Sequence, residues 1–532
     1  MNKNNKFNHS PLTIPHSPFF IGSGMGSMTS AALMAKLFKK KVLILEQHFV
    51  AGGFTHEFAR QNKYQWDVGL HYVGQMQPDE WLSRQIMDLI TDNQLQWHKM
   101  PEHFEKFVYP DFSFLVHAQK EKYIADLIAQ FPDEAAAIKT YFRDVNKIAM
   151  WYRRHHLAEV FPLPLRLPVQ LLNFFQKNQA LQTTEHYLSQ HFQDDKLKAL
   201  LASQWGDYGL PPSQSAFVIH AVIVHHYFNG AYYPVGGAQQ IAKNIRAVIE
   251  KAGGQFLTRR AVTEIIVNNN QAIGVKVNAK TGTTEPEYFA PVIVSGVGAV
   301  NTFLRLLPPS ATLSFIEEIK AFPKGPSALS LYIAFKESPE KLGFKGENHW
   351  IFENYDHNQA FKGDTPLDNI NLCFLSFPSL KDPKASIHTA EIVTICDYHF
   401  FEKWQAQAWK QRDPEYYELK AQITEKLLNL VEKHYPGFKA LVEYTELSTP
   451  LTLEHFTHRL HGAMYGMPAI PAKYQKKWLT AKTPVKNLYL TGSDVWSLSI
   501  GGAMMGGVVT ASVLAGKLGL FKIIWGAKKG RV

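Results

Sequence analysis

The chain has 532 residues and a formal net charge of +10 at pH 7. Hydrophobic residues make up 45% and charged residues 19%, which is typical of a globular protein with a large core and room for two or three domains. The two cysteines, Cys373 and Cys396, exclude a disulfide scaffold and a cysteine-rich metal site, and they fit a reducing compartment.

The amino-terminal 17 residues are polar and interrupted by prolines, and they contain no apolar stretch of the kind found in a secretory signal. We therefore expect a cytoplasmic protein. The positive residues are spread along the chain, with a basic carboxyl-terminal end and no nucleic-acid-binding motif. Anionic lipid is thus a better candidate partner than nucleic acid, although solvated lysines without a partner explain the charge equally well.

Residues 19–48 read FFIGSGMGSMTSAALMAKLFKKKVLILEQH, which predicts a strand, a glycine turn, a helix and a second strand ending in an acid. Such a unit holds the pyrophosphate of a dinucleotide. Gly22 permits the tight turn, and Gly24 lets the backbone approach the phosphate beside the free amides of the helix. Glu46 can accept the ribose hydroxyls of the adenosine half, and Ser27 stands at the third glycine position. The alternative is an αβ turn that binds no nucleotide.

Residues 78–160 carry apolar side chains at helical spacing, and we expect this region to be largely helical. Residues 161–177, FPLPLRLPVQLLNFFQK, place three prolines before a short helix whose polar residues Gln170, Asn173 and Lys177 fall on one stripe. Such a segment can lie on a bilayer surface and open an apolar tunnel to it. It can equally be a surface helix that faces the core.

The α/β pattern returns after residue 230. A glycine pair, Gly236-Gly237, begins an amphipathic helix, and a predicted hairpin turns at residues 268–271. Residues 302–455 alternate strand-like and helical segments. The strand-like NLYLTGSD then precedes VWSLSIGGAMMGGVVTASVLAG, which is free of charge and long enough to span a membrane. Its glycine and serine content instead favours a buried helix packed against the cofactor.

The predicted fold class is α/β, with a discontinuous dinucleotide-binding domain of Rossmann type and an inserted substrate domain of α+β type that combines a mixed sheet with helices. We expect the first domain to comprise residues 18–76, 232–300 and 456–520. The substrate or lipid-binding domain comprises residues 77–231 and 301–455. The segment GVGAVN at 296–301 lacks a third glycine and a ribose-binding acid, so it reads as a strand end of the first domain.

Motifs along nearly the whole chain resemble the FAD-dependent phytoene desaturase and retinol saturase family of NAD(P)/FAD-dependent oxidoreductases. They are GSGMGS, LEQHFVAGG, DVGLHYVG, WGDYGLPPSQSAF, HHYFNGAYYPVGG, VGAVNTFLRLLP, GAMYG and LTGSDVWSLSIGGAMMGG, and they lie between residues 22 and 516. The chain departs from the family pattern at Phe54 and Thr55, and at Gln47 and His48.

The resemblance implies a non-covalently bound FAD. By position, Gly52, Gly53 and Phe54 would lie along the flavin, Asp494 would face the pyrophosphate and ribityl chain, and Gly502 would lie near the isoalloxazine ring. The full set implied to contact FAD is Gly22, Gly24, Met25, Gly26, Glu46, Gln47, Gly52, Gly53, Phe54, Val262, Gly492, Asp494, Gly502 and Ala503.

The implied activity is reduction of a carbon–carbon double bond in an apolar isoprenoid, resembling a retinoid or carotenoid, by hydride transfer from flavin N5. Such a reaction needs a proton donor at the other carbon, and the candidate catalytic residues are His71, Tyr72, Tyr208 and Tyr233. His71 can also position the substrate or flavin, or serve the structure alone. The trio His220, His225 and His226 has no acidic or cysteine partner at ligand spacing, so we expect no metal.

Two other functions stay open at this point. The same fold can carry a carotenoid (phytoene-type) desaturase or isomerase, and the chain can be a lipid-binding flavoprotein without turnover. The match through DVGLHYVG and GDYGLPP favours the saturase. No dedicated NAD(P)-binding domain is evident, so the electron donor is open, with NAD(P)H as one candidate. Peripheral membrane contact is open as well, and a nucleic-acid partner is not expected.

Overall fold

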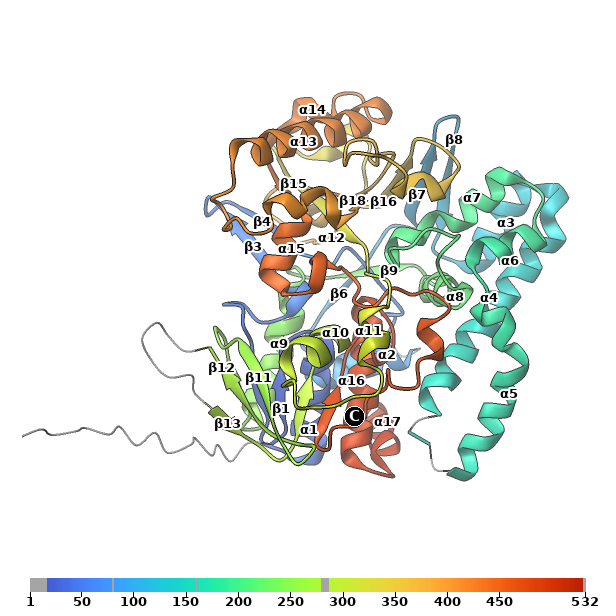
Figure 1. The fold of residues 1–532 in the computed structure, drawn as a ribbon. Helices are drawn as coiled ribbons and strands as arrows, with labels where there is room; N and C mark the ends of the chain where they lie inside the picture. Colours follow the sequence, from blue (N-terminus) through green and yellow to red (C-terminus); the bar gives the residue numbers. More distant parts are fainter. Residues whose placement is uncertain (1–16, 79–80, 159, 162, 279–286, 530–532) are drawn as a thin grey trace, which may run out of the picture.

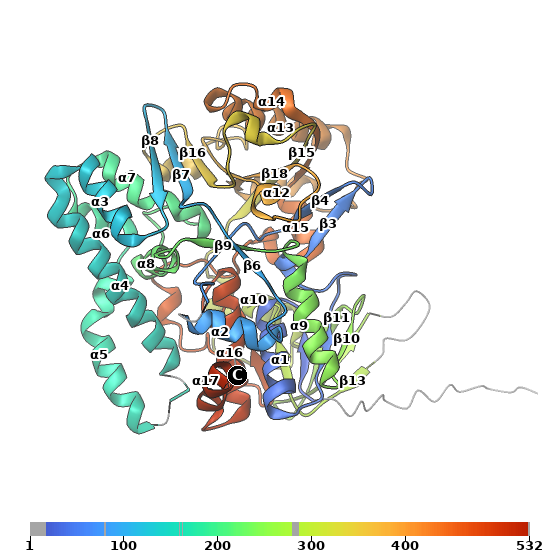
Figure 2. The same cartoon turned by 180° about the vertical axis from the view of Figure 1, so that it is seen from behind.

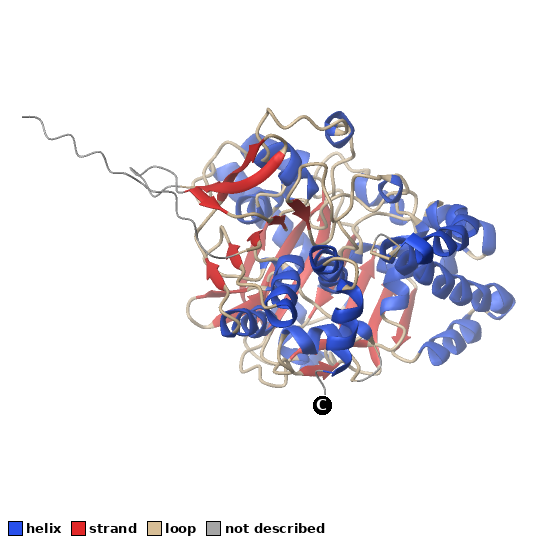
Figure 3. Cartoon of the chain, turned by 90° about the horizontal axis from the view of Figure 1, so that it is seen from below, coloured by secondary structure: helices blue, strands red, loops and turns tan. Residues whose placement is uncertain are grey.

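A computed structural model describes residues 17–78, 81–158, 160–161, 163–278 and 287–529. Two sheets lie one above the other in Figure 1, and a layer of helices stands beside both. Figure 3 shows from below how this helical layer projects from one side of the part that contains the strands.

The lower sheet has five parallel strands, and its three inner strands are fully buried. Their spatial order is β10 (Gln255–Leu257), β2 (Leu43–Leu45), β1 (Phe19–Ile21), β14 (Ile293–Ser295) and β20 (Leu488–Leu490). The sheet therefore assembles from three distant parts of the chain. Strands buried on both faces read as short apolar runs, and FFI, LIL and IVS are such runs.

Three helices pack together around this sheet, and α1 touches both of the others. They are α1 (Met25–Phe38), α9 (Gln239–Lys251) and α16 (Ser499–Ala515). Helix α16 is the charge-free segment near the carboxyl terminus, and it is packed along α1 as a buried helix. Within the part of the chain that the structure describes, no helix combines the length and apolar character needed to cross a bilayer.

Three small antiparallel sheets accompany the two larger ones. The predicted hairpin is confirmed, with β11 paired to β12 across a turn at Asn268 and Gln271. The strands are β11 (Val262–Asn268), β12 (Gln271–Val277) and β13 (Glu287–Phe289); β3 (Glu57–Arg60) and β4 (Tyr64–Asp67); and β5 (Val73–Gly74), β9 (Ala231–Pro234) and β6 (Trp97–Lys99). The hairpin of β3 and β4 packs against the upper sheet.

The upper sheet has seven strands and is mixed, with one parallel pair between β16 and β7. Its order is β19 (Val442–Ser448), β15 (Ser327–Phe335), β18 (Thr389–Cys396), β17 (Leu372–Ser376), β16 (Asn348–Phe352), β7 (His103–Tyr109) and β8 (Phe112–His117). Helices α13 (Pro414–His434) and α14 (Phe438–Leu441) lie at the outer end of this sheet in Figures 1 and 2.

The expectation that residues 78–160 are largely helical was wrong for residues 97–117. This stretch forms β6, β7 and β8, and β7 pairs with β16 from the distant half of the chain. The turn at Pro110-Asp111 joins two runs rich in aromatic and β-branched residues, which favour strands. Apolar spacing alone does not separate such short runs from helices.

The helical layer consists of the segments between β8 and β9, whereas α2 (Leu82–Ile90) packs against α1 and α17 near the lower sheet. The helices of the layer are α3 (Lys120–Gln130), α4 (Ala135–Leu157), α5 (Leu163–Leu181), α6 (Thr184–His191), α7 (Asp195–Ala202) and α8 (Phe217–His226). Shorter elements join the layers: α10 (Ala299–Asn301), α11 (Ile316–Lys320), α12 (Pro378–Lys381), α15 (Pro450–Thr457) and the terminal α17 (Gly519–Lys529). The predicted fold class, α/β with a separate domain of sheet and helices, is confirmed.

Candidate active site

A cavity of about 1460 Å³ is lined by residues of both sheets. Gly24 and Glu46 belong to the lower sheet and its first turn, whereas Ser330, Phe374 and Val393 belong to the upper sheet. The cavity exceeds the range of about 300–1,000 Å³ usual for a single small-molecule site. It therefore has room for a dinucleotide and a second ligand together.

The first turn of the lower sheet leaves bare backbone facing the cavity. Gly22 has a φ of +83°, which favours glycine, and a Cβ added to Gly24 would meet no atom within 4 Å. Gly53 packs closely against Gly24, because a Cβ added to Gly53 would lie 3.0 Å from Gly24 Cα. No side chain caps the N-terminus of α1, which begins at Met25. A free helix N-terminus of this kind suits the charge of a pyrophosphate.

Glu46 is held at the carboxyl end of β2 by three donors. Its Oε2 accepts hydrogen bonds from Ser23 N at 2.8 Å and Ser23 Oγ at 2.6 Å, and its Oε1 accepts one from His48 N at 2.7 Å. The side chain is nearly buried yet lines the cavity. These bonds orient the carboxylate for ribose hydroxyls. The next residue, Gln47, donates to the Phe456 carbonyl at 3.0 Å.

Two other small residues of α1 serve the packing of the fold. A Cβ on Gly26 would lie 2.4 Å from Gly492 Cα, so the glycine is required where α1 meets the end of β20. Ser27, at the third glycine position, packs against Gly296, where a Cβ would lie 2.0 Å from Ser27 Oγ. The chain therefore accommodates the serine by placing a glycine opposite it.

Twelve of the fourteen residues implied to contact FAD line this cavity. They are Gly22, Gly24, Met25, Gly26, Glu46, Gln47, Gly52, Gly53, Phe54, Val262, Gly492 and Ala503. Asp494 and Gly502 are not among the lining residues. Asp494 instead accepts hydrogen bonds from Ala299 N at 2.8 Å and Met467 N at 3.3 Å, which tie the segment after β20 to α10 and to the loop that contains Met467. The open glycine backbone, the uncapped helix and the oriented carboxylate fit FAD.

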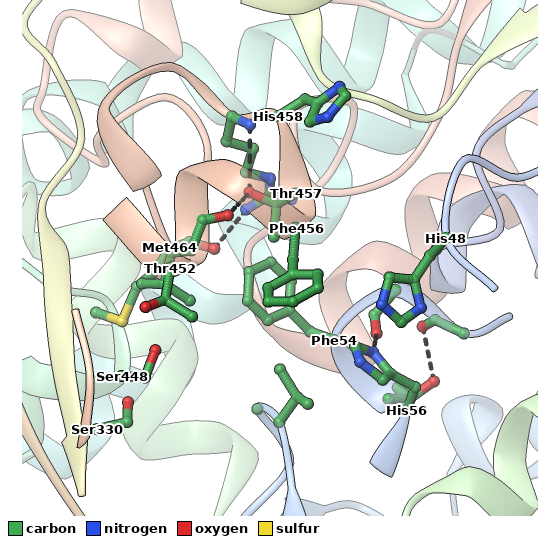
Figure 4. A pocket seen from close by; sticks show the side chains of 18 of the residues that line it. His48, Phe54, His56, Ser330, Ser448, Thr452, Phe456, Thr457, His458 and Met464 are labelled. Atoms are coloured by element: carbon green, nitrogen blue, oxygen red, sulfur yellow. Dashed lines mark hydrogen bonds between the residues drawn. The ribbon is translucent and has the colours of Figure 1, made fainter. Parts of the chain in front are cut away.

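The wall beyond the glycine cradle is aromatic. Phe54 carries the Arg459 guanidinium over its ring at 5.0 Å from the centroid, and Gly69 packs against the same ring. Figure 4 shows Phe54 and Phe456 in this pocket together with His56. On the upper sheet, Ser330 of β15 pairs with Ser448 of β19, and both line the cavity. This wall suits an apolar ligand with few polar contacts.

Of the four candidate catalytic residues, only His71 lines the cavity. Its Nδ1 lies 2.9 Å from Glu391 Oε2, and its ring meets Phe374 edge-on at 5.0 Å. Burial, assisted by the charge of Lys381, lowers the pKa of His71 to about 3. The imidazole is therefore neutral at physiological pH.

The other three candidates are buried and do not line the cavity. Tyr208 Oη lies 3.2 Å from His220 Nδ1, and Tyr233 donates to Asp67. Burial raises the pKa of Tyr208 and Tyr233 above the ordinary tyrosine value. Tyr72 Oη lies between the carboxyl groups of two acids that sequence reasoning did not name, as described below.

A buried lysine lies behind His71. Lys381 Nζ, at the end of α12, donates to the His71 carbonyl at 2.9 Å and to Ser376 Oγ at 2.6 Å, and it also donates to Asn348 Oδ1. Burial lowers the pKa of Lys381 to about 7 and raises that of Glu391 to about 8. Sequence reasoning missed both residues, because a lone lysine and a strand glutamate have no local signature. Among the described residues, no group of three or more His, Cys, Asp or Glu is placed to hold a metal ion.

Comparisons with known proteins agree with this geometry. A family model described as flavin containing amine oxidoreductase matches residues 29–515. An all-trans-retinol 13,14-reductase of Danio rerio is 33% identical over 93% of this chain and 85% of its own length. The chain belongs to the retinol saturase and phytoene desaturase family of flavin-containing oxidoreductases. It is an FAD-dependent oxidoreductase.

Other members of this oxidoreductase family are also similar over most of the chain. An inactive all-trans-retinol 13,14-reductase of Danio rerio is 32% identical over 93% of this chain and 85% of its own length. Prolycopene isomerase 1 of an Oncidium hybrid cultivar is 26% identical over 94% of this chain and 84% of its own length.

Solved structures of flavin oxidases share the fold. Putrescine oxidase has a TM-score of 0.60 with 12% identity, and it covers 94% of this chain and 99% of its own. Cyclohexylamine oxidase from Brevibacterium oxydans has a TM-score of 0.57 with 14% identity, and it covers 96% of this chain and 99% of its own. At this level of identity the likeness concerns the fold alone.

Proposed function

We propose that this oxidoreductase reduces a carbon–carbon double bond of an apolar isoprenoid of retinoid or carotenoid type. The observation that carries the proposal is the continuity of one cavity from the glycine cradle at Gly24 to the aromatic wall at Phe54 and Phe374. FAD bound at the Gly24 backbone and Glu46 would supply the hydride for such a reduction.

The chain's own residues hold the two ligands against each other. The backbone at Gly24 and the carboxylate of Glu46 bind the dinucleotide, and Phe54 with Arg459 over its ring shapes the wall beside it. Trp350 and Phe374 of the upper sheet, with ring centroids 4.6 Å apart, offer an apolar surface to a polyene. Such a surface excludes water from the reacting carbons.

The relatives favour reduction over the alternatives. Those that are 31–33% identical include four named as reductases, whereas the prolycopene isomerases are 25–26% identical. The relative named as inactive is 32% identical, which keeps a lipid-binding flavoprotein without turnover as the second candidate.

The test uses the purified yellow holoprotein, reduced without oxygen and mixed with all-trans-retinol or a carotenoid. If the protein reduces the substrate, the absorbance of oxidised flavin should return, and mass spectrometry should detect a product that has gained two hydrogens. A product with unchanged mass and altered geometry would indicate an isomerase. With the oxidised holoprotein in a parallel mixture, a product that has lost two hydrogens together with bleaching of the flavin would indicate a desaturase. Binding of lipid without any reaction would support the non-catalytic candidate.

The electron donor forms a separate part of the proposal, and NAD(P)H is the external donor that we propose. Adding NADH and NADPH separately to the oxygen-free holoprotein tests it. Bleaching of the flavin by either nucleotide supports the assignment, whereas a flavin that stays oxidised with both points to a protein donor.

We also propose peripheral contact with a membrane through α5 and α17. Helix α5 exposes large apolar side chains, with Phe174 71% and Phe175 77% exposed. Helix α17 exposes Phe521 and Trp525 beside lysines. Both helices lie at the same end of the molecule in Figures 1 and 2. Apolar side chains flanked by cations are typical of helices that lie in a bilayer surface. The cytoplasmic location stays a prediction.

A further inference from the structure

The Tyr72 hydroxyl lies between two carboxyl groups. Its oxygen is 2.5 Å from Glu105 Oε1 and 2.7 Å from Asp207 Oδ2. Glu105 comes from β7, Asp207 ends the short helix η3 (Ser203–Asp207), and Tyr72 follows the β3–β4 hairpin. Three distant parts of the chain therefore meet at one phenol.

Counting protons shows that this group holds an undissociated acid. A phenol has one hydrogen and donates one hydrogen bond. Two contacts of hydrogen-bond length between oxygens require two hydrogens, and an ionised carboxylate can only accept. One of the two carboxyl groups must therefore supply the second hydrogen, and together they carry a single negative charge.

The surrounding donors show which acid carries the proton. Glu105 accepts hydrogen bonds from Trp350 Nε1 at 3.0 Å and from Gln204 Nε2 at 2.6 Å, in addition to Tyr72. Asp207 accepts from no other donor among the described residues. Donors stabilise the ionised form of an acid. Glu105 is accordingly the carboxylate, and Asp207 is the neutral acid that donates to Tyr72.

Asp207 is also the member of this group that faces the cavity. It is partly exposed and lines the cavity, whereas Tyr72 and Glu105 are buried and do not. Its position is built into the wall, because a Cβ on Gly206 would lie 2.4 Å from the Trp350 ring and the Gly206 carbonyl accepts from Tyr465 Oη at 3.1 Å.

We propose that Asp207 is the catalytic acid of the double-bond reduction, with Tyr72 and Glu105 as positioning residues that keep it protonated. This inference rests on the proposed function. Hydride from the reduced flavin forms a C–H bond at one carbon, and the π pair of the double bond takes the Asp207 proton at the other. The Asp207 O–H bond breaks, its electron pair stays on the carboxylate, and solvent restores the proton. The substrate gains two electrons and the flavin loses two.

The electrostatic environment supports this proton placement. Burial, followed by the charge of Glu105, raises the pKa of Asp207 well above its ordinary value. Burial raises the pKa of Glu105 to about 7, and its hydrogen-bond donors and the charge of Lys381 oppose that rise. The titratable groups that face Asp207 from the elements around it are Glu105, Tyr72, Tyr227 and Tyr465.

His71 is the one catalytic candidate from the sequence that lines the cavity, and it is a poorer acid. Its imidazole is neutral, with a pKa of about 3. A neutral imidazole has only its N–H to donate, and that group is very weakly acidic. His71 is therefore better suited to contact the substrate than to protonate it.

The first experiment replaces the acid with its isostere. Asp207→Asn keeps a donor toward Tyr72 but has no proton to transfer, so we expect FAD retention with turnover about 10²–10⁴-fold lower. Asp126→Asn, on the exposed surface of α3, is the matched control and should behave as wild type. Turnover of Asp207→Asn within a few fold of wild type would overturn the proposal.

The second experiment removes the charge that keeps Asp207 protonated. An acid catalyst loses activity as the pH rises through its pKa. Glu105→Gln lowers the pKa of Asp207, so the alkaline limb of the pH–rate profile should move to lower pH by roughly one unit or more. A purely structural role for Glu105 would lower the rate and leave the limb in place, and that result would count against the proposal.

A spectrum separates failure of this inference from failure of the proposed function. Infrared spectra of the oxidised holoprotein at neutral pH should show a protonated-carboxyl C=O band that shifts in D₂O and disappears in Asp207→Asn. If the wild type reduces no isoprenoid, both the proposed function and the catalytic role of Asp207 are wrong. The C=O band still shows in that case whether Asp207 carries the proton. If the wild type is active and the band does not depend on Asp207, the proton placement is wrong.

Discussion

Lys381 donates a hydrogen bond to the backbone carbonyl of His71 at 2.9 Å and so ties the upper sheet to the segment that faces the cavity. The same ammonium also donates to Ser376 and Asn348. Because His71 and Tyr72 are adjacent, this contact helps to hold both the cavity wall and the phenol that joins Glu105 to Asp207.

The first prediction concerns the pH dependence of stability. The folded-state pKa of Lys381 is lowered to about 7 from 10.5, so the unfolded chain binds more protons between those values. The free energy of unfolding of the wild type should therefore rise relative to Lys381→Met from pH 7 to 10.5, by up to about 1.4 kcal/mol per pH unit. Urea unfolding at three pH values measures it. If the free energy of unfolding changed with pH in the same way for the wild type and Lys381→Met, burial would not lower the pKa of Lys381. Lys384→Met, at an exposed position, is the control.

The second prediction separates cofactor exclusion from misfolding. Gly24 has a φ of −63° and open space at its Cβ, so Gly24→Val should fold normally but lose FAD, since the side chain enters the phosphate site. Gly26→Val should instead fail to fold, because its side chain meets the backbone of Gly492. Circular dichroism and flavin absorbance of both variants provide the measurement. A yellow Gly24→Val protein would place the cofactor elsewhere.

The third prediction concerns His71. Because its imidazole is neutral, we expect His71→Ala to retain FAD, to lose turnover about 10-fold or more through a poorly positioned substrate, and to keep the pH–rate profile of the wild type. Steady-state rates from pH 5 to 9 check this expectation. A displaced profile would mean that the imidazole takes part in proton transfer, and unchanged turnover would remove His71 from the site.

The fourth prediction tests the membrane surface. Replacing Phe174 and Phe175 of α5 with serine should weaken flotation with anionic liposomes, because each exposed ring contributes about 1.5–3 kcal/mol when fully buried in an apolar phase. Leu115→Ser on β8 removes an exposed apolar side chain at the other end of the molecule and is the control. Equal flotation of all forms would reject the contact.

Local signals in the sequence were sufficient for the first βαβ unit. The run FFI, the turn from Gly22 to Gly24 and the apolar run after it predict strand, turn and helix, because each depends on residues close in sequence. The hairpin around residues 268–271 is predictable for the same reason. Strands β7 and β8 were missed, since β7 is stabilised as a strand by pairing with β16, more than 200 residues away, and β8 pairs in turn with β7.

The sequence by itself determined the dinucleotide turn, the fold class and the family resemblance, because these rest on backbone geometry and on motifs contiguous along the chain. Only the tertiary structure decided which acids and bases face the cavity. Tyr72, Glu105 and Asp207 are far apart in sequence, and they share protons only because folding brings their oxygens into hydrogen-bond contact and removes water around them. Burial, which no local motif encodes, then changes the charge of each group.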